Sequence, residues 1–159
     1  MPDVHPAAFV DASAQVIGDV EIGADSSVWM QAVVRGDVNR IRIGARSNLQ
    51  DAVVVHVMHG THPTVIGDDV TIGHSAVVHG CTIGDRVLIG MGAIVLNGVR
   101  VGEESIVAAG TVVTEGTAIP PRSLVMGTPG KVRRTLTDAD VASILESARH
   151  YVDLSKNYQ

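Results

Sequence analysis

The chain has 159 residues and a formal net charge of −5. That length suits one domain with its own core, and the lack of any basic run argues against nucleic acids and anionic membranes as partners. No apolar stretch approaches the ~18 residues of a membrane span, and the N-terminus lacks a basic-then-apolar signal segment. Because the lone Cys81 cannot form an internal disulfide, we expect a cytoplasmic protein without membrane attachment.

Aliphatic residues recur at six-residue steps through most of the chain, often with a glycine directly after them. The positions that keep the step are Val10, Val16, Ile22, Val28, Val34, then Ile43, Leu49, Val55, then Ile66, Ile72, Val78, then Ile83, Ile89, Val95, Val101, Val107 and Val113. A helix cannot keep positions six apart on one face, whereas a strand plus a turn can. The period predicts a mainly β domain over residues 1–135, a parallel β-helix of roughly six triangular coils.

Three irregularities interrupt the repeat. Residues 35–42 lengthen one step to nine, residues 56–63 shorten a double step to eleven, and Val78 and Ile83 are only five apart. Insertions in a solenoid usually form loops on one face, where function is often found. We therefore expect loops at these places, beside the charged cluster and the histidines.

The repeat ends at Pro120-Pro121 and at residues 127–130, which predict a loop. Thr137 and Asp140 then resemble a capping box, with aspartate replacing the usual glutamate. Apolar residues follow at helical spacing, namely Val141, Ile144, Leu145, Ala148 and Val152. Residues 136–159 therefore predict an amphipathic C-terminal α-helix of roughly 20 residues, which must pack on the prism or on a neighbouring subunit.

Three of the seven histidines lie inside the repeat, where an imidazole has no structural use. His56 and His79 each follow an apolar anchor, and His74 is third in its hexad. One coil separates His56 from His74, so such spacing can place these side chains on one side of the prism. Three neutral imidazoles with an open fourth position are the ligand set of catalytic zinc. The alternative is three solvated histidines on an exposed face.

Several motifs together resemble the γ-class carbonic anhydrases, and in particular their short bacterial branch. They are Arg35-Gly36-Asp37, Asn48-Leu49-Gln50-Asp51, His56, Gly73-His74, His79-Gly80-Cys81, Ile89-Gly90-Met91-Gly92-Ala93, Gly127-Thr128-Pro129, Arg133 and Tyr151-Val152. The likeness covers essentially the whole chain. It implies a homotrimer of left-handed β-helices with metal sites between subunits.

The resemblance also implies roles for individual residues. His56, His74 and His79 would bind Zn²⁺, two from one protomer and the third from its neighbour, and Fe²⁺ or Co²⁺ would fit the same ligands. Which histidine comes from the neighbour is left open. Six further residues would support the site: Arg35 and Asp37 at the interface, Asp51 paired with an arginine, Gln50 orienting the bound water, and Asn48 and Tyr151 lining the pocket. Their alternative roles are ordinary surface charge, turn formation and helix packing.

The activity that this resemblance implies is the reversible hydration of CO₂ to bicarbonate. A divalent ion lowers the pKa of a bound water to near neutrality, so that the water can attack CO₂. Efficient family members carry an acidic proton-shuttle loop after the first histidine, but residues 57–63 contain no acid. His59 or His62 would have to carry protons instead, unless both are merely solvated. With Asp153 where the family has asparagine, we expect a slow hydratase.

Two other classes of function fit the same pattern. One is a CoA-dependent acyltransferase or acyl thioester hydrolase, which would use a histidine as general base. The other is a non-catalytic trimer that contains metal. Cys81 is expected to be a small buried hydrophobe, and Trp29 to lean outward at a subunit interface.

Overall fold

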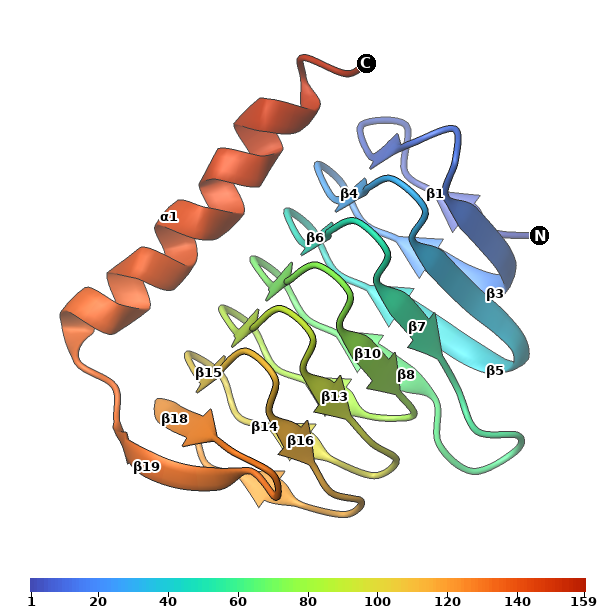
Figure 1. Cartoon of the computed structure of the whole chain (residues 1–159). Coiled ribbons are helices and arrows are strands. Elements are labelled where there is room, and N and C mark those ends of the chain that lie inside the picture. Colours follow the sequence, from blue (N-terminus) through green and yellow to red (C-terminus); the bar gives the residue numbers. More distant parts are fainter.

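The computed structural model describes residues 1–159 as a parallel β-solenoid with one C-terminal helix (Figure 1). The solenoid has three faces around its axis. The first, the helix-covered face, consists of β2 (Phe9–Val10), β4 (Ser27–Val28), β6 (Asn48–Leu49), β9 (Thr71–Ile72), β12 (Leu88–Ile89), β15 (Ile106–Val107) and β18 (Ser123–Met126), with β19 (Lys131–Thr135) antiparallel to β18. Its seven parallel strands confirm the predicted solenoid, with about seven turns against the six expected.

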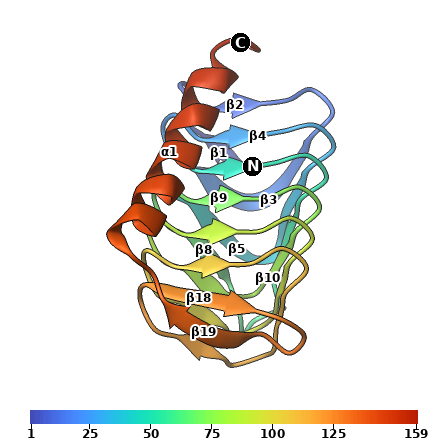
Figure 2. The same ribbon diagram turned by 60° about the vertical axis from the view of Figure 1, so that its left-hand side comes forward.

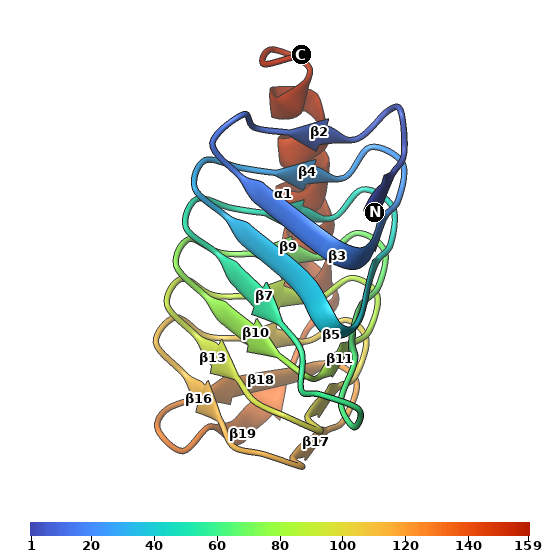
Figure 3. The ribbon, with the colours of Figure 1, turned by 90° about the vertical axis from the view of Figure 1, so that its right-hand side faces the viewer.

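The second face carries His56 and His79, and we call it the histidine face. It consists of the first part of β3 (Gln15–Ile22) and of β5 (Val33–Ile43), then β7 (Val54–His56), β10 (Val77–His79), β13 (Ile94–Val95) and β16 (Val112–Val113), visible in Figure 3. The third face holds β1 (Asp3–Val4), the second part of β3 and β5, then β8 (Thr64–Ile66), β11 (Thr82–Ile83), β14 (Arg100–Val101) and β17 (Ala118–Ile119).

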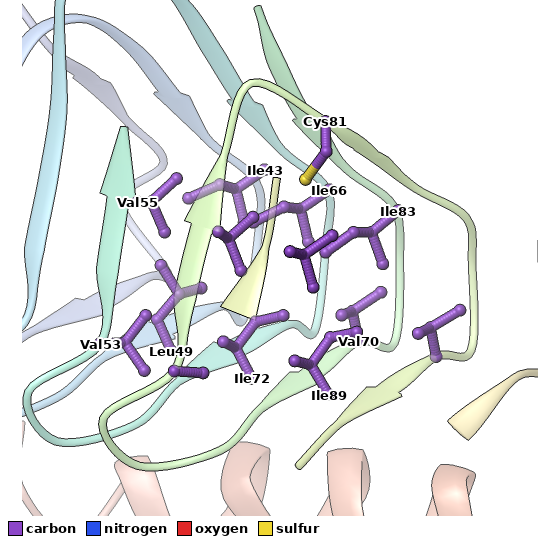
Figure 4. Packing of buried hydrophobic residues seen from close by; sticks show 14 of the residues in the cluster. Ile43, Leu49, Val53, Val55, Ile66, Val70, Ile72, Cys81, Ile83 and Ile89 are labelled. Atoms are coloured by element: carbon purple, nitrogen blue, oxygen red, sulfur yellow. The ribbon is translucent and has the colours of Figure 1, made fainter. Parts of the chain in front are cut away.

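The core is a single column of aliphatic side chains inside the coils. It contains 28 buried residues, and the inward position of each strand is the aliphatic residue of the hexad (Figure 4). Leu49, Ile72 and Ile89, for example, lie in register on three successive coils, each fully buried. Cys81 is part of this core, as expected, and burial raises the pKa of its thiol to about 12.

Residues 35–42, the first irregularity of the six-residue repeat, form part of a strand, so the loop predicted there is wrong. These residues lie within β5, which pairs with β3 on the histidine face and again on the third face. The extra residues bulge out of this pairing at the corner, because β3 has eight residues against eleven in β5, and the register passes from Gly18 opposite Gly36 to Val20 opposite Ile41. Residues 57–63 do form a loop, closed by a bridge between Met58 and His62. The five-residue step is a tight corner at Gly80, whose φ of +59° favours glycine.

One corner of the solenoid carries a column of charged residues, one per coil, in left-handed backbone conformation. They are Asp25, Arg46, Asp69, Arg86, Glu104 and Arg122, with alternating sign. Arg46 forms a two-pronged pair with Asp69, with both nitrogen–oxygen distances 2.8 Å. Arg86 Nε lies 3.1 Å from Glu104 Oε1 on the next coil. We call this feature the charge column.

Helix α1 (Asp138–Ser155) begins with the predicted capping box, in which Thr137 and Asp140 each bond the other's backbone N–H. Arg134, followed by Thr137, holds the pKa of Asp140 well below its usual range. Ile144 and Ala148 are buried on the inner face of α1, which contacts β4, β6 and β9 of its own solenoid (Figure 2). Of the two predicted packing partners, the helix therefore uses its own prism. No helix in the structure is long and apolar enough to cross a membrane.

The position of Trp29 differs from the subunit interface predicted for it. Its side chain does lean out of the prism, but it is only 4% exposed because α1 and the last residues of its own chain cover it. The indole packs edge-on against Tyr151 and Tyr158, with ring centroids 5.5 and 5.2 Å away, and its Nε1 donates to Ser27 Oγ. Trp29 therefore anchors the helix and does not lie at an open subunit interface.

Candidate metal centre

Two of the three predicted ligands lie together on the histidine face. His56 ends β7 and His79 ends β10, and the two residues are register partners on adjacent coils. Parallel pairing in register stacks their side chains on the outer surface, so His56 Nδ1 lies 3.1 Å from His79 Nε2. The solenoid therefore builds the pair out of residues 23 positions apart in sequence.

An oxygen acceptor occupies the far side of each of these two rings. Asp37 Oδ1 lies 2.9 Å from His56 Nε2, and Asn97 Oδ1 lies 2.7 Å from His79 Nδ1. In a neutral imidazole the nitrogen that faces an acceptor carries the hydrogen and the other nitrogen carries a lone pair. Both lone pairs then point into the gap between the rings, where they repel each other unless a cation binds there.

The gap between the rings fits a metal ion. With zinc–nitrogen bonds of ~2.0–2.1 Å, two ligands of a tetrahedral site lie about 3.3 Å apart, close to the observed separation of the two nitrogens. Carboxylate and amide oxygens behind the rings are the usual outer partners of metal-bound histidines. The pair therefore suits two ligand positions of a divalent metal such as zinc.

Arg35 and Asp37 extend this arrangement along β5, and their role at a subunit interface stays a prediction. Arg35 pairs with the second oxygen of Asp37, while the first faces His56. The hydrogen bond from His56, with a further contribution from Arg35, holds the pKa of the Asp37 carboxyl below its usual range. Asp37 thus stays ionised behind the His56 ring.

His74 lies apart from the pair. It occupies the turn between β9 and β10, at the corner that joins the helix-covered face to the histidine face. Its Nδ1 is 2.9 Å from Asp51 Oδ2, so within the chain the partner of Asp51 is a histidine, and the arginine partner stays a prediction. No group of three histidine, cysteine or acidic side chains in the structure could hold a metal by itself.

The predicted pocket residues gather around His74. Gln50 is 6% exposed, and its Nε2 donates to Asn48 Oδ1 at 3.1 Å. Asn48 is buried and donates in turn to Thr71 Oγ1 at 2.9 Å, which makes it a support for Gln50. Burial, and then the nearby charge of Asp51, raise the pKa of the Tyr151 hydroxyl.

Beside His74 and Gln50 an apolar groove of about 440 Å³ runs down the solenoid. Its other walls include Leu88, Met91 and Ile106 from two lower coils, with Ser147 of α1 on the other side. The groove exists because α1 contacts β4, β6 and β9, whereas β12 and β15 lie beyond its main contacts.

The loop after His56 lies next to the pair on its other side. His59 is exposed, whereas His62 turns inward, bonds Thr61 and packs over Gly80, directly after His79. His62 also shares a cleft of about 390 Å³ with Asn97 and Glu115. The sequence shows no acid within this loop, but the fold brings one there from a lower coil.

Each protomer thus carries two different half-sites. The first, on the histidine face, holds Arg35, Asp37, His56, His79 and Asn97. The second, at the adjoining corner, holds Gln50, Asp51, His74 and Tyr151. Sequence reasoning found every one of these residues except Asn97. The signal for Asn97 was its spacing, since it follows His79 by 18 residues, one coil.

The fold and the histidine pair define a hexapeptide-repeat solenoid with two facing imidazoles on one face. The sequence profile of the family "Bacterial transferase hexapeptide (six repeats)" matches residues 63–97 and 80–115. The crystal structure of a hexapeptide transferase family protein from Anaplasma phagocytophilum has a TM-score of 0.95 and 40% identity, covering 99% of this chain and 93% of that one.

Similar sequences narrow the class further. The chain is 58% identical to the "Probable carbonic anhydrase" of Methanocaldococcus jannaschii, over 92% of this chain and 91% of that protein. It is 49% identical to "Gamma carbonic anhydrase 1, mitochondrial" of Arabidopsis thaliana, over 98% of this chain, and spans only 58% of that longer protein. The chain belongs to the γ-class carbonic anhydrase family.

Proposed function

We propose that this protein is a metal-dependent carbonic anhydrase that hydrates CO₂ to bicarbonate, reversibly, at sites between subunits of a homotrimer. The observation that carries the proposal is the facing pair of His56 Nδ1 and His79 Nε2, each ring held from behind by an oxygen. Zn²⁺ is the proposed ion, and Fe²⁺ or Co²⁺ would fit the same ligands. A chain whose lone cysteine is buried suits a reducing compartment such as the cytoplasm.

The structure supports His74 as the ligand that comes from the neighbouring subunit. His56 and His79 already form a pair, whereas His74 sits on the other half-site. Two unlike half-sites that meet head to tail generate a closed ring, because each protomer offers one of each. The proposed ring of three then contains three equal sites.

An aliphatic stripe beside the histidine pair supports the same ring. Val33, Val54, Val77, Ile94 and Val112 lie in register on successive coils and point outward from the histidine face. Val54 is 38% exposed. Such a column gains from burial against a second copy. Light scattering at micromolar concentration is expected to return three times the mass of the chain, and a monomer that still holds its metal would contradict the shared site.

A divalent ion held by these histidines would supply the acidity that makes a water nucleophilic near neutral pH. The chain's own residues do the rest. Asp37 and Asn97 hold the two rings with their lone pairs facing inward. Gln50, fixed by Asn48, orients the attacking water in the neighbouring half-site by hydrogen bonding, and apolar groove residues next to it give CO₂ a dry approach.

Metal analysis and a CO₂ hydration assay on anaerobically purified protein test this function. We expect about one divalent ion per protomer, and a measurable but slow hydration rate because the loop after His56 carries no acid of its own and only Glu115 of a lower coil shares its cleft. Full metal content without any hydration would leave the ligands in place and remove the carbonic anhydrase assignment.

The replacement Gln50→Ala separates water orientation from metal binding. Gln50 is buried against Asn48 and, in this proposal, is not a ligand. We expect the variant to keep its metal and its trimer while the hydration rate falls by roughly 10-fold to 100-fold, in the range for lost outer contacts at a metal site. Loss of the metal from this variant would show that Gln50 is itself a ligand.

The apolar groove beside His74 favours a second candidate function. Its volume of about 440 Å³ exceeds what CO₂ needs and suits the acyl chain of a thioester. An acyl thioester hydrolase or acyltransferase would then use the same half-site. Turnover of acyl-CoA substrates by protein that shows no CO₂ hydration would favour this alternative.

A further inference from the structure

We propose that Asn97 is a positioning residue for His79, which it orients so that Nε2 faces the metal. This inference rests on the proposed metal centre. Asn97 Oδ1 accepts the hydrogen of His79 Nδ1 at 2.7 Å. Because the hydrogen is fixed on Nδ1, the lone pair stays on Nε2, which lies 3.1 Å from His56 Nδ1.

The backbone beside Gly80 leaves space for the hydrogen bond between Asn97 and His79. Asn97 sits in the turn after β13, one coil below His79, and its side chain reaches up past Gly80. A Cβ atom at Gly80 would lie only 2.2 Å from Asn97 Oδ1 and 2.9 Å from the Cβ of His62. Glycine at position 80 therefore serves two purposes: it permits the positive φ of the corner and it leaves room for the Asn97 amide.

Asn97 and Asp37 act on the two rings in different ways. Asp37 is held ionised beside Arg35 and His56, whereas the amide of Asn97 is neutral. Asn97 therefore fixes the orientation of His79 without adding a negative charge to the centre. A bound cation then keeps more of its positive charge, and with it more power to acidify water.

An alternative role for Asn97 is purely local, since asparagine followed by glycine is a common turn sequence. The replacement Asn97→Gly distinguishes the two, because glycine suits the turn at least as well but offers no acceptor. Asn97→Asp is the matched rescue, since it restores the acceptor. Glu115→Gln, in the same cleft but without a contact to His79, is the control.

Zinc affinity, measured by competition with a chromogenic chelator on the full trimer, is the first measurement. We expect Asn97→Gly to raise the zinc Kd about 10-fold to 100-fold, with wild-type affinity in Glu115→Gln and wild-type or tighter affinity in Asn97→Asp, whose carboxylate restores the acceptor. An unchanged Kd in Asn97→Gly overturns the proposal, as does an equal loss in Asn97→Asp.

The second measurement needs no metal and so separates this proposal from the function itself. Nitrogen-15 chemical shifts of the His79 ring in the metal-free protein at pH 8 report which nitrogen carries the hydrogen. We expect it on Nδ1 in the wild type and in Asn97→Asp, and distributed over both nitrogens in Asn97→Gly. The same shifts in all three proteins would refute the role of Asn97, whereas a wild type that never binds zinc would refute the metal centre.

Discussion

Replacing His74 with alanine is expected to reduce the metal content to well below one ion per protomer while each solenoid stays folded. The side chain is 42% exposed and bonds only Asp51, so its loss removes little from the core. It removes one ligand of three at every proposed site, and two imidazoles bind a divalent ion far more weakly than three. Metal analysis after gel filtration, with circular dichroism as a check of folding, measures both effects.

Mixing two defective variants shows whether the third ligand comes from a neighbour. In a ring of three, every site combines His56 and His79 of one protomer with His74 of the next. Any mixed trimer of His74→Ala and His56→Ala chains then regains one intact site, so refolding an equal mixture restores about a quarter of all sites. If all three ligands came from one chain, the mixture would restore none.

Replacing Ile72 with aspartate is expected to abolish folding. Ile72 is fully buried between Leu49 and Ile89 in the narrow core (Figure 4), where no cation or hydrogen-bond donor lies close enough to pair with a carboxylate. An unpaired buried charge costs several kcal/mol, comparable to the ~5–15 kcal/mol that stabilises a typical domain. Expression yield in the soluble fraction and the thermal melt measure the effect.

Two matched replacements test the register of the repeat. Thr82→Asp places the same carboxylate at an exposed, outward position next to Ile83, opposite Arg100, and should melt like the wild type. Ile72→Val removes a single methylene from the core and should cost about 0.5–1.5 kcal/mol. A soluble Ile72→Asp variant with a normal melt would mean that Ile72 does not point inward.

The solenoid could be predicted because its repeat is local. The residue types within one hexad are enough to predict which side chain points inward. Val34, Val55 and Val78 are all buried, as the six-residue spacing predicts. The strand at residues 35–42 could not be found in this way, because it depends on pairing with β3 across a bulge, not on its own pattern. The position of Trp29 likewise depends on where α1 packs.

Most residues of the candidate site could be predicted from the sequence, but their positions relative to one another could be predicted only in part. The histidines could be named from the repeat and from a family resemblance, but the spacing favoured one side of the prism for all three, whereas His74 lies at a different corner from His56 and His79. Corner geometry depends on how turns of different length rotate the side chains. Asn97 could not be predicted as a site residue, because asparagine followed by glycine is also a common turn sequence.

The alternating signs of the charge column restrict how many coils can be deleted from or added to the solenoid. Its residues alternate in sign from coil to coil, and ion pairs join Arg46 to Asp69, Arg86 to Glu104 and Arg122 to Glu104. Deleting one coil, such as residues 86–103, would bring Asp69 beside Glu104 and join two like charges. Deleting two coils, residues 86–121, would bring Asp69 beside Arg122 and preserve the alternation. Shortening or lengthening this solenoid is therefore electrostatically neutral only in steps of two coils.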